Sequence, residues 1–245
     1  FMGISASLVL GIPLGTFIAE QWGWRLTFLL VAALSAISTL GILRFLPNIP
    51  PQPTVPIRDQ LHALKNAKII SAQLMVALML IGHFTIYTYF SPFLHRTMGL
   101  STETISIILL IFGIAGVFGG WIGGWSTDKF GGAKTFLIIL ILFSISLYAL
   151  PFATVSYITL IPVIMFWGIL AWAPAAPVQS YLIQTAPETA DIQISLFTSF
   201  MHLGVAIGSA FGGYIVNHYP ITMNAWIGGL MGFLSFLVGV YSVMY

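Results

Sequence analysis

Residues 124–134 read Gly-Trp-Ser-Thr-Asp-Lys-Phe-Gly-Gly-Ala-Lys, a short polar stretch between two long apolar segments. Charged residues make up only 6% of the chain and hydrophobic residues 58%, whereas a soluble domain is roughly a quarter charged. Because the flanking segments can dissolve in lipid, we interpret the stretch as a loop in which the chain leaves the membrane and returns. The protein is therefore predicted to be an integral membrane protein.

Eight apolar segments are long enough to cross a bilayer as helices, which takes about 20 residues because lipid offers no partner to unpaired backbone groups. The fold class is thus predicted to be all-α, with eight transmembrane helices. The predicted spans are approximately 2–19, 25–46, 69–92, 103–125, 134–152, 157–183, 192–216 and 224–244.

Basic residues are divided unevenly between the two sides of the membrane that this alternation defines. One side carries Arg44, Arg58, Lys65, Lys68, Lys129 and Lys134, and the other has only Arg25 and Arg96. The positive-inside rule predicts that the first side is cytoplasmic. The loop over 47–68 and both chain ends fall on that side.

The stretch 47–68 differs in composition from the rest of the chain. Its first half is rich in proline, which predicts a stiff spacer. Ile57, Leu61 and Leu64 then recur at helical spacing, as in a short helix that lies on the membrane surface. We predict a cytoplasmic linker between two membrane bundles, and a merely long loop is the alternative.

Residues 11–19 resemble residues 208–216, and in each case a brief outer loop and another apolar span follow. If the first two spans repeat the last two, the first bundle also has six helices; chance similarity is the alternative. We then expect four further spans, in roughly 130 residues, ahead of Phe1, so that the chain is truncated at its N-terminus. The predicted domains are 1–46, the last two helices of an N-terminal bundle; 47–68, the linker with its surface helix; and 69–245, a C-terminal six-helix bundle.

Within the opening stretch, Gly124, Asp128, Lys129, Gly131 and Lys134 together resemble the loop motif of the major facilitator superfamily of transporters. Gly132 departs from that motif, because a base is common at its position. In the family such a loop latches the two bundles together on the cytoplasmic side, and the resemblance implies this gating role for Asp128. The alternative is a charge that only terminates a helix.

A second motif indicates which subgroup of the family the chain resembles. Gly11, Pro13 and Gly15 are similar to the antiporter motif of drug:proton antiporters, in the variant of arabinose (sugar) efflux permeases, except that Ile12 stands before the proline. The run from Gly23 to Phe28 resembles the start of the sixth span in that group.

The resemblance implies a secondary active transporter of the plasma (inner) membrane that exports a small organic solute by alternating access, in exchange for protons. Sugars, nucleosides or purines, and drugs remain open as the solute. Its expected partners are the solute, protons and the lipid bilayer, and it is expected to be a monomer with no cofactor and no metal. Proton-coupled uptake by a symporter is the closest alternative, and a channel or a non-transporting scaffold is another.

Two sets of glycines recur every four residues within predicted spans, so each set lies on one helix face. The sets are Gly116, Gly120 and Gly124 in one span, and Gly204, Gly208 and Gly212 in another. Such faces let a neighbouring backbone approach closely. They predict either rigid packing or surfaces on which two bundles slide.

Polar side chains at membrane depth are the candidate lining of a substrate cavity, because such groups rarely face lipid. The candidates are His83, Tyr87, Trp172, Gln179 and His202. Pro174 and Pro177 are expected to bend or loosen their span. Each candidate has an ordinary packing role as its alternative.

Acidic residues are confined to loops and span ends, at Glu20, Asp59, Glu103, Asp128, Glu188 and Asp191. A proton-coupling group is therefore expected in the preceding spans, or else at His83 or His202. The chain has no cysteine and no cluster of nucleophile, base or metal ligands, so an enzyme is not predicted. The net charge of +2 is too small to suggest a nucleic-acid partner.

Overall fold

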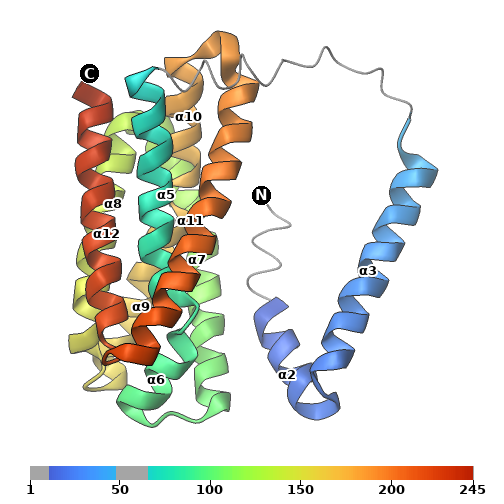
Figure 1. Ribbon diagram of the computed structural model, residues 1–245. Coiled ribbons are helices and arrows are strands. Elements are labelled where there is room, and N and C mark those ends of the chain that lie inside the picture. Colours follow the sequence, from blue (N-terminus) through green and yellow to red (C-terminus); the bar gives the residue numbers. More distant parts are fainter. Residues whose placement is uncertain (1–10, 48–65, 245) are drawn as a thin grey trace. The chain divides into compact units, whose positions relative to one another are not determined.

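The structure, a computed structural model, describes residues 11–47 and 66–244, and the chain divides into two compact units at Pro56 (Figure 1). Within the described ranges, seven helical segments are long and apolar enough to cross a membrane. This confirms the prediction of an all-α membrane protein. Part of the span predicted over 2–19 and most of the predicted linker, including its surface helix, lie outside the described residues.

The first unit is a helical hairpin of α2 (Ile12–Trp22) and α3 (Trp24–Phe45). Gly23 joins the two helices with φ 86°, a conformation that glycine adopts without strain. Thr27 Oγ1 donates a hydrogen bond to Gly15 O at 3.4 Å and so ties the helices together. No residue of α3 is buried within this unit, as expected for an apolar helix whose surface meets lipid or further helices.

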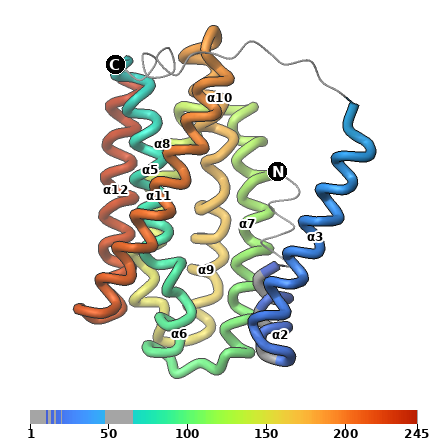
Figure 2. The backbone as a smooth tube through the Cα atoms, turned by 45° about the vertical axis from the view of Figure 1, so that its right-hand side comes forward, coloured from blue at the N-terminus to red at the C-terminus, as the bar shows by residue number. Residues whose placement is uncertain are grey.

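The second unit is a bundle whose membrane-spanning segments alternate in direction along the chain (Figures 1 and 2). Its helices are α5 (Ala67–Tyr87), α6 (Phe90–Met98), α7 (Thr102–Phe130), α8 (Gly132–Ala153), α9 (Tyr157–Trp172), α10 (Ala175–Thr185), the short 3-10 helix η2 (Pro187–Thr189), α11 (Ala190–His218) and α12 (Met223–Met244). The end of α12 returns beside the start of α5, where Ser242 Oγ donates a hydrogen bond to Lys68 O at 2.9 Å.

Helix α5 packs between α11 and α12, α7 packs against α9, and α8 lies between α9 and α12. Serine and asparagine side chains reinforce this arrangement. Ser235 Oγ donates to Met75 O at 2.6 Å, and Asn224 Nδ2 donates to Thr85 O at 2.9 Å. Away from water such bonds keep a polar side chain from being left unpaired.

Glycines allow α11 to lie directly on the backbone of α5. A Cβ on Gly204 would lie 2.7 Å from Ala77 O, and one on Gly208 would lie 2.6 Å from Ile81 O. Gly212 meets Thr85 O just as closely. The three glycines therefore form one rigid contact inside the second unit.

On α7 only one of the expected glycines, Gly116, packs closely, and it meets the side chain of Trp172 and not a backbone. Gly119 meets the backbone of α9 at Ile169 and Gly123 meets the backbone of Ala173, just after α9, whereas a Cβ on Gly120 or Gly124 would find nothing within 4 Å among the described residues. The expectation that Gly120 and Gly124 admit a neighbouring backbone is thus not met within this unit. Because the sequence offers adjacent glycine pairs, the position of α9 decides which member of each pair is used.

The polar stretch 124–134 is helical over most of its length, so the interpretation of it as a loop is wrong. Helix α7 continues to Phe130 and α8 begins at Gly132, which leaves Gly131, with φ 83°, as the junction. Thr135 Oγ1 donates to Ser126 O at 3.1 Å across the turn. A continuous helix satisfies its own backbone at the membrane surface, and glycine permits the abrupt change of direction.

Candidate functional site

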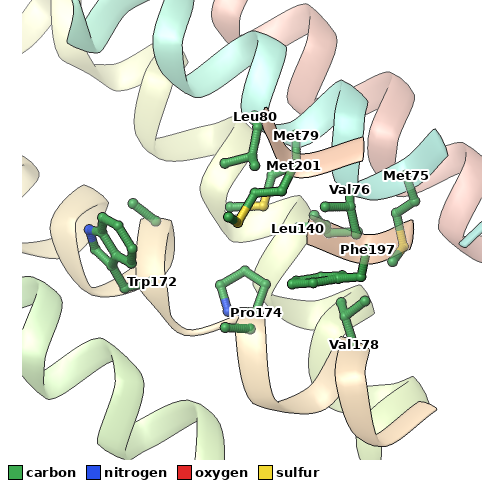
Figure 3. Close-up of a pocket in the computed structure, with 12 residues that line it drawn as sticks. Met75, Val76, Met79, Leu80, Leu140, Trp172, Pro174, Val178, Phe197 and Met201 are labelled. Atoms are coloured by element: carbon green, nitrogen blue, oxygen red, sulfur yellow. The ribbon is translucent and has the colours of Figure 1, made fainter. Parts of the chain in front are cut away.

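A cavity of about 70 Å³ lies between α10 and α11, with α5 and α8 behind it (Figure 3). Apolar side chains from all of these helices line it. The lining residues are Met75, Val76, Met79, Leu80, Leu140, Ala171, Trp172, Pro174, Ala175, Val178, Phe197 and Met201. Met75 and Met79 are one turn apart on α5, and Phe197 and Met201 are one turn apart on α11. Helical periodicity therefore turns each pair toward the same space.

One wall of the cavity is made where a membrane-spanning helix is interrupted. Helix α9 ends at Trp172 and α10 begins at Ala175, so the regular helix is interrupted at Ala173 and Pro174. Proline has no backbone N–H to continue the helical hydrogen bonding, which is the reason for the interruption. The predicted loosening of the span near Pro174 is confirmed, whereas Pro177 lies within α10.

Trp172 separates the cavity from α7. Its ring packs over Gly116, where a Cβ would lie 2.7 Å from Trp172 Cδ1 and 3.2 Å from Trp172 Nε1. The indole nitrogen is buried, has no hydrogen-bond partner among the described residues, and lies on the side of the ring away from the methionines in Figure 3. The cavity therefore receives the hydrocarbon part of the indole and not its N–H.

A row of polar side chains lies on the exposed face of α11, next to the cavity. Ser195, Thr198, Ser199 and His202 recur at helical spacing and are all exposed within the second unit. Thr198 and Ser199 hydrogen-bond to carbonyls one turn earlier, both at 3.1 Å. His202 directly follows Met201, which lines the cavity. Polar groups at this depth normally face a water-filled space or other protein and not lipid.

His83 lies in an aromatic cluster and not in the lining of the cavity. Its ring is 2% exposed and stacks on Tyr87, with centroids 5.0 Å apart. Trp167 lies 5.4 Å away, and Phe112 and Phe143 each lie 6.1 Å away. His83 Nδ1 and Trp167 Nε1 are buried without a hydrogen-bond partner among the described residues. Rings thus surround the imidazole of His83, and none of them belongs to the lining of the cavity.

The loop motif lies at the bundle end that also holds Lys68. Asp128 is exposed and has no ion-pair partner in the described part of the chain, while Lys129 Nζ lies 5.0 Å above the ring of Trp125. A Cβ on Gly132 would lie 2.6 Å from Pro177 O of α10. A basic residue would not fit there, which gives a physical reason for the departure from the motif.

A model of the Major Facilitator Superfamily matches residues 1–191. This chain belongs to the major facilitator superfamily. The family and the apolar helices make it a multi-pass membrane protein.

Curated relatives of this major facilitator protein match almost all of its length. It is 34% identical over 229 residues to the uncharacterized MFS-type transporter YbcL of Bacillus subtilis, covering 94% of this chain and 59% of the relative. It is 32% identical over 238 residues to YtbD, another uncharacterized MFS-type transporter of that organism, with the same coverage. A probable sugar efflux transporter of Helicobacter acinonychis is 27% identical over 237 residues, covering 96% of this chain and 60% of the relative. The chain therefore spans about 60% of the length of these relatives.

The predicted cavity residues are distributed over different environments in this major facilitator bundle. Trp172 lines the cavity, Gln179 is half-buried one turn beyond the lining residue Ala175, and His202 is exposed beside it. His83 and Tyr87 share the aromatic cluster. Binding roles for these side chains stay predictions, as do the roles of Gly11, Pro13 and Gly15 at the start of α2.

Sequence reasoning missed the residues that give the cavity its character. Met75, Met79, Phe197 and Met201 line it, yet an apolar side chain in a chain that is mostly apolar carries no distinguishing signal. The spacing of four residues in each pair predicts a shared face. It does not predict that the two faces meet across a space.

Proposed function

We propose that this protein is part of a secondary active transporter that exports a small organic solute by alternating access, in exchange for protons. The observation that carries the proposal is the cavity between α10 and α11, which adjoins an exposed polar row at membrane depth. Such a combination suits a solute that leaves water, is held within the membrane and returns to water. The similarity to the Helicobacter relative, a probable sugar efflux transporter, supports the direction of transport.

The proposed domains explain how access to the solute site would alternate between the two sides of the membrane. Residues 1–46 belong to an N-terminal bundle, 47–68 form a cytoplasmic linker, and 69–245 form the C-terminal bundle. Parallel bundles of this kind alternate the access of a site at the bilayer midplane by moving against each other. The transporter works as a monomer in the plasma (inner) membrane, with both chain ends and the end that carries Lys68, Lys129 and Lys134 in the cytoplasm.

Asp128 is proposed to act as a cytoplasmic latch. A carboxylate next to a helix start can accept hydrogen bonds from free backbone amides and is favoured by the helix dipole. We expect Asp128→Asn to slow transport by about tenfold while leaving solute affinity within about twofold of normal, because an amide lacks the charge. Initial rates and equilibrium binding in the same preparation measure the two quantities. Equal rates for Asp128→Asn and the parent protein at matched expression would contradict the latch.

The direction and the energy source can be tested in cells that express the protein. Labelled arabinose, adenosine and ethidium serve as one sugar, one nucleoside and one amphipathic dye. Collapsing the proton gradient should increase cellular accumulation of a probe that is exported and decrease accumulation of a probe that is taken up. Loss of accumulation on collapse would support uptake by a symporter instead. Electrical conductance without saturable flux would support a channel, and no flux of any kind a scaffold.

A further inference from the structure

We propose that the cavity between α10 and α11 is a subsite for an apolar group, such as a small ring or a branched alkyl group, on an amphipathic solute. This inference rests on the proposed transport function and names the chemical class of the solute. It disfavours one of the three solute classes that the sequence leaves open, because a bare sugar has no apolar group to place there.

The lining of the cavity offers no polar side-chain atom to a ligand. All of its side chains are hydrocarbon, thioether or aromatic, and the one polar atom among them, Trp172 Nε1, faces Gly116 on α7. A sugar hydroxyl in this space would give up its hydrogen bonds to water and find no replacement. An apolar group would instead be removed from water without that loss. The lining therefore selects for apolar groups.

The size of the cavity suits one group of a solute and not the whole molecule. Its volume is about 70 Å³, whereas pockets that enclose an entire small molecule measure about 300–1,000 Å³. Met75 and Met79 stand on one wall and Met201 on another. Methionine is unbranched and polarizable, so these walls can adapt to groups of different shape.

The polar row on α11 indicates what the rest of the solute is like. Thr198 and His202 are exposed next to the lining residues Phe197 and Met201. A solute with its apolar group in the cavity can therefore place hydroxyl or charged groups against this row. A lipid acyl chain fits poorly, because it would bring hydrocarbon against polar side chains at membrane depth. The occupant is therefore an amphipathic solute.

Two probes that differ only by an apolar ring test the subsite directly. Dissociation constants for glucose and phenyl β-glucoside are measured with the full chain in lipid nanodiscs, by isothermal titration. The phenyl compound should bind at least about tenfold more tightly, because its ring is removed from water in the cavity. Equal affinity for the two probes would overturn the proposal.

Two variants test whether a preference for phenyl β-glucoside over glucose arises in the cavity. Ala175→Leu adds a side chain to a half-buried lining position and should reduce the preference for the phenyl compound to less than about threefold. Ala210→Leu makes the same change on an exposed part of α11 that does not line the cavity, and it should keep the preference. An undiminished preference in Ala175→Leu would mean that the ring partitions into lipid, and this also overturns the proposal.

A second variant guards against misfolding of Ala175→Leu. Met201→Ala enlarges the cavity and should shift the preference toward naphthyl β-glucoside by about tenfold relative to the phenyl compound. An unchanged order of the two aromatic probes would count against the subsite. Failure of the transport proposal has a different signature, since vesicles would then show ring-dependent binding without flux of either probe.

Discussion

The aromatic cluster around His83 and the cavity beside Trp172 both lie inside the six-helix unit, and both contain a buried ring nitrogen without a partner among the described residues. They differ in what surrounds that ring. Tyr87, Phe143 and Trp167 close around His83, whereas methionine and valine side chains leave space next to Trp172. A polar ring at membrane depth is therefore a weak sign of a binding site. The packing of its neighbours decides whether a ligand has room.

The largest expected effect comes from removing a ring from the cluster. Phe143→Ala should lower the free energy of unfolding by about 3–5 kcal/mol, because Phe143 is fully buried and its loss leaves a cavity that the surrounding rings cannot fill. Chemical denaturation in bicelles measures the change. Phe152→Ala, at a position that is 67% exposed, is the matched control and should cost much less. Equal costs at the two positions would show that the cluster is not the tightly packed region.

The same change at the wall of the cavity should cost less. Phe197 already faces empty space on one side, so Phe197→Ala should lower the free energy of unfolding by about 1–3 kcal/mol. It should also weaken binding of phenyl β-glucoside, which Phe143→Ala in a folded preparation should not do. Calorimetric titration and denaturation of the same samples measure both effects. A greater loss of stability from Phe197→Ala than from Phe143→Ala would reverse the comparison.

Replacing the imidazole tests whether the cluster has a role beyond packing. His83→Phe keeps a ring of similar volume and removes a nitrogen that has no partner, so stability should change by less than about 1.5 kcal/mol and transport should persist. Initial transport rates measure the outcome, with His202→Phe on the exposed polar row as the comparison variant. Loss of transport in His83→Phe with normal stability would return His83 to the candidates for substrate binding or proton coupling.

The smallest effect, on ligand affinity, is expected from removing the indole N–H of Trp172. Trp172→Phe removes an N–H that faces Gly116 and not the cavity, so the affinity for phenyl β-glucoside should change by less than about threefold. Gly116→Ala should have a larger effect, because its Cβ would displace the indole ring toward the cavity. Isothermal titration with both variants gives the comparison. A tenfold loss in Trp172→Phe alone would mean that the N–H reaches the ligand.

The glycine sets of α11 and α7 show where the periodicity of the sequence is sufficient to predict a helix contact and where it is not. On α11, the face of Gly204, Gly208 and Gly212 is the only one with a glycine at every fourth residue, and all three meet the backbone of α5. On α7, each of Gly120 and Gly124 has a glycine directly before it, so two adjacent faces are equally small. The contact with α9 uses the other face. The spacing of glycines predicts a helix contact only when a single face of the helix is small enough to make that contact.

The sequence by itself determined the class of the protein, the approximate helical spans and the interruption near Pro174. These features are local, since they follow from the length of apolar runs and from the backbone limits of proline. Tertiary structure decided that His83 is enclosed by rings, that the polar stretch continues α7 to Phe130, and that a cavity remains between α10 and α11. A cavity is the space that side chains from several helices fail to fill, so it depends on positions far apart in the chain.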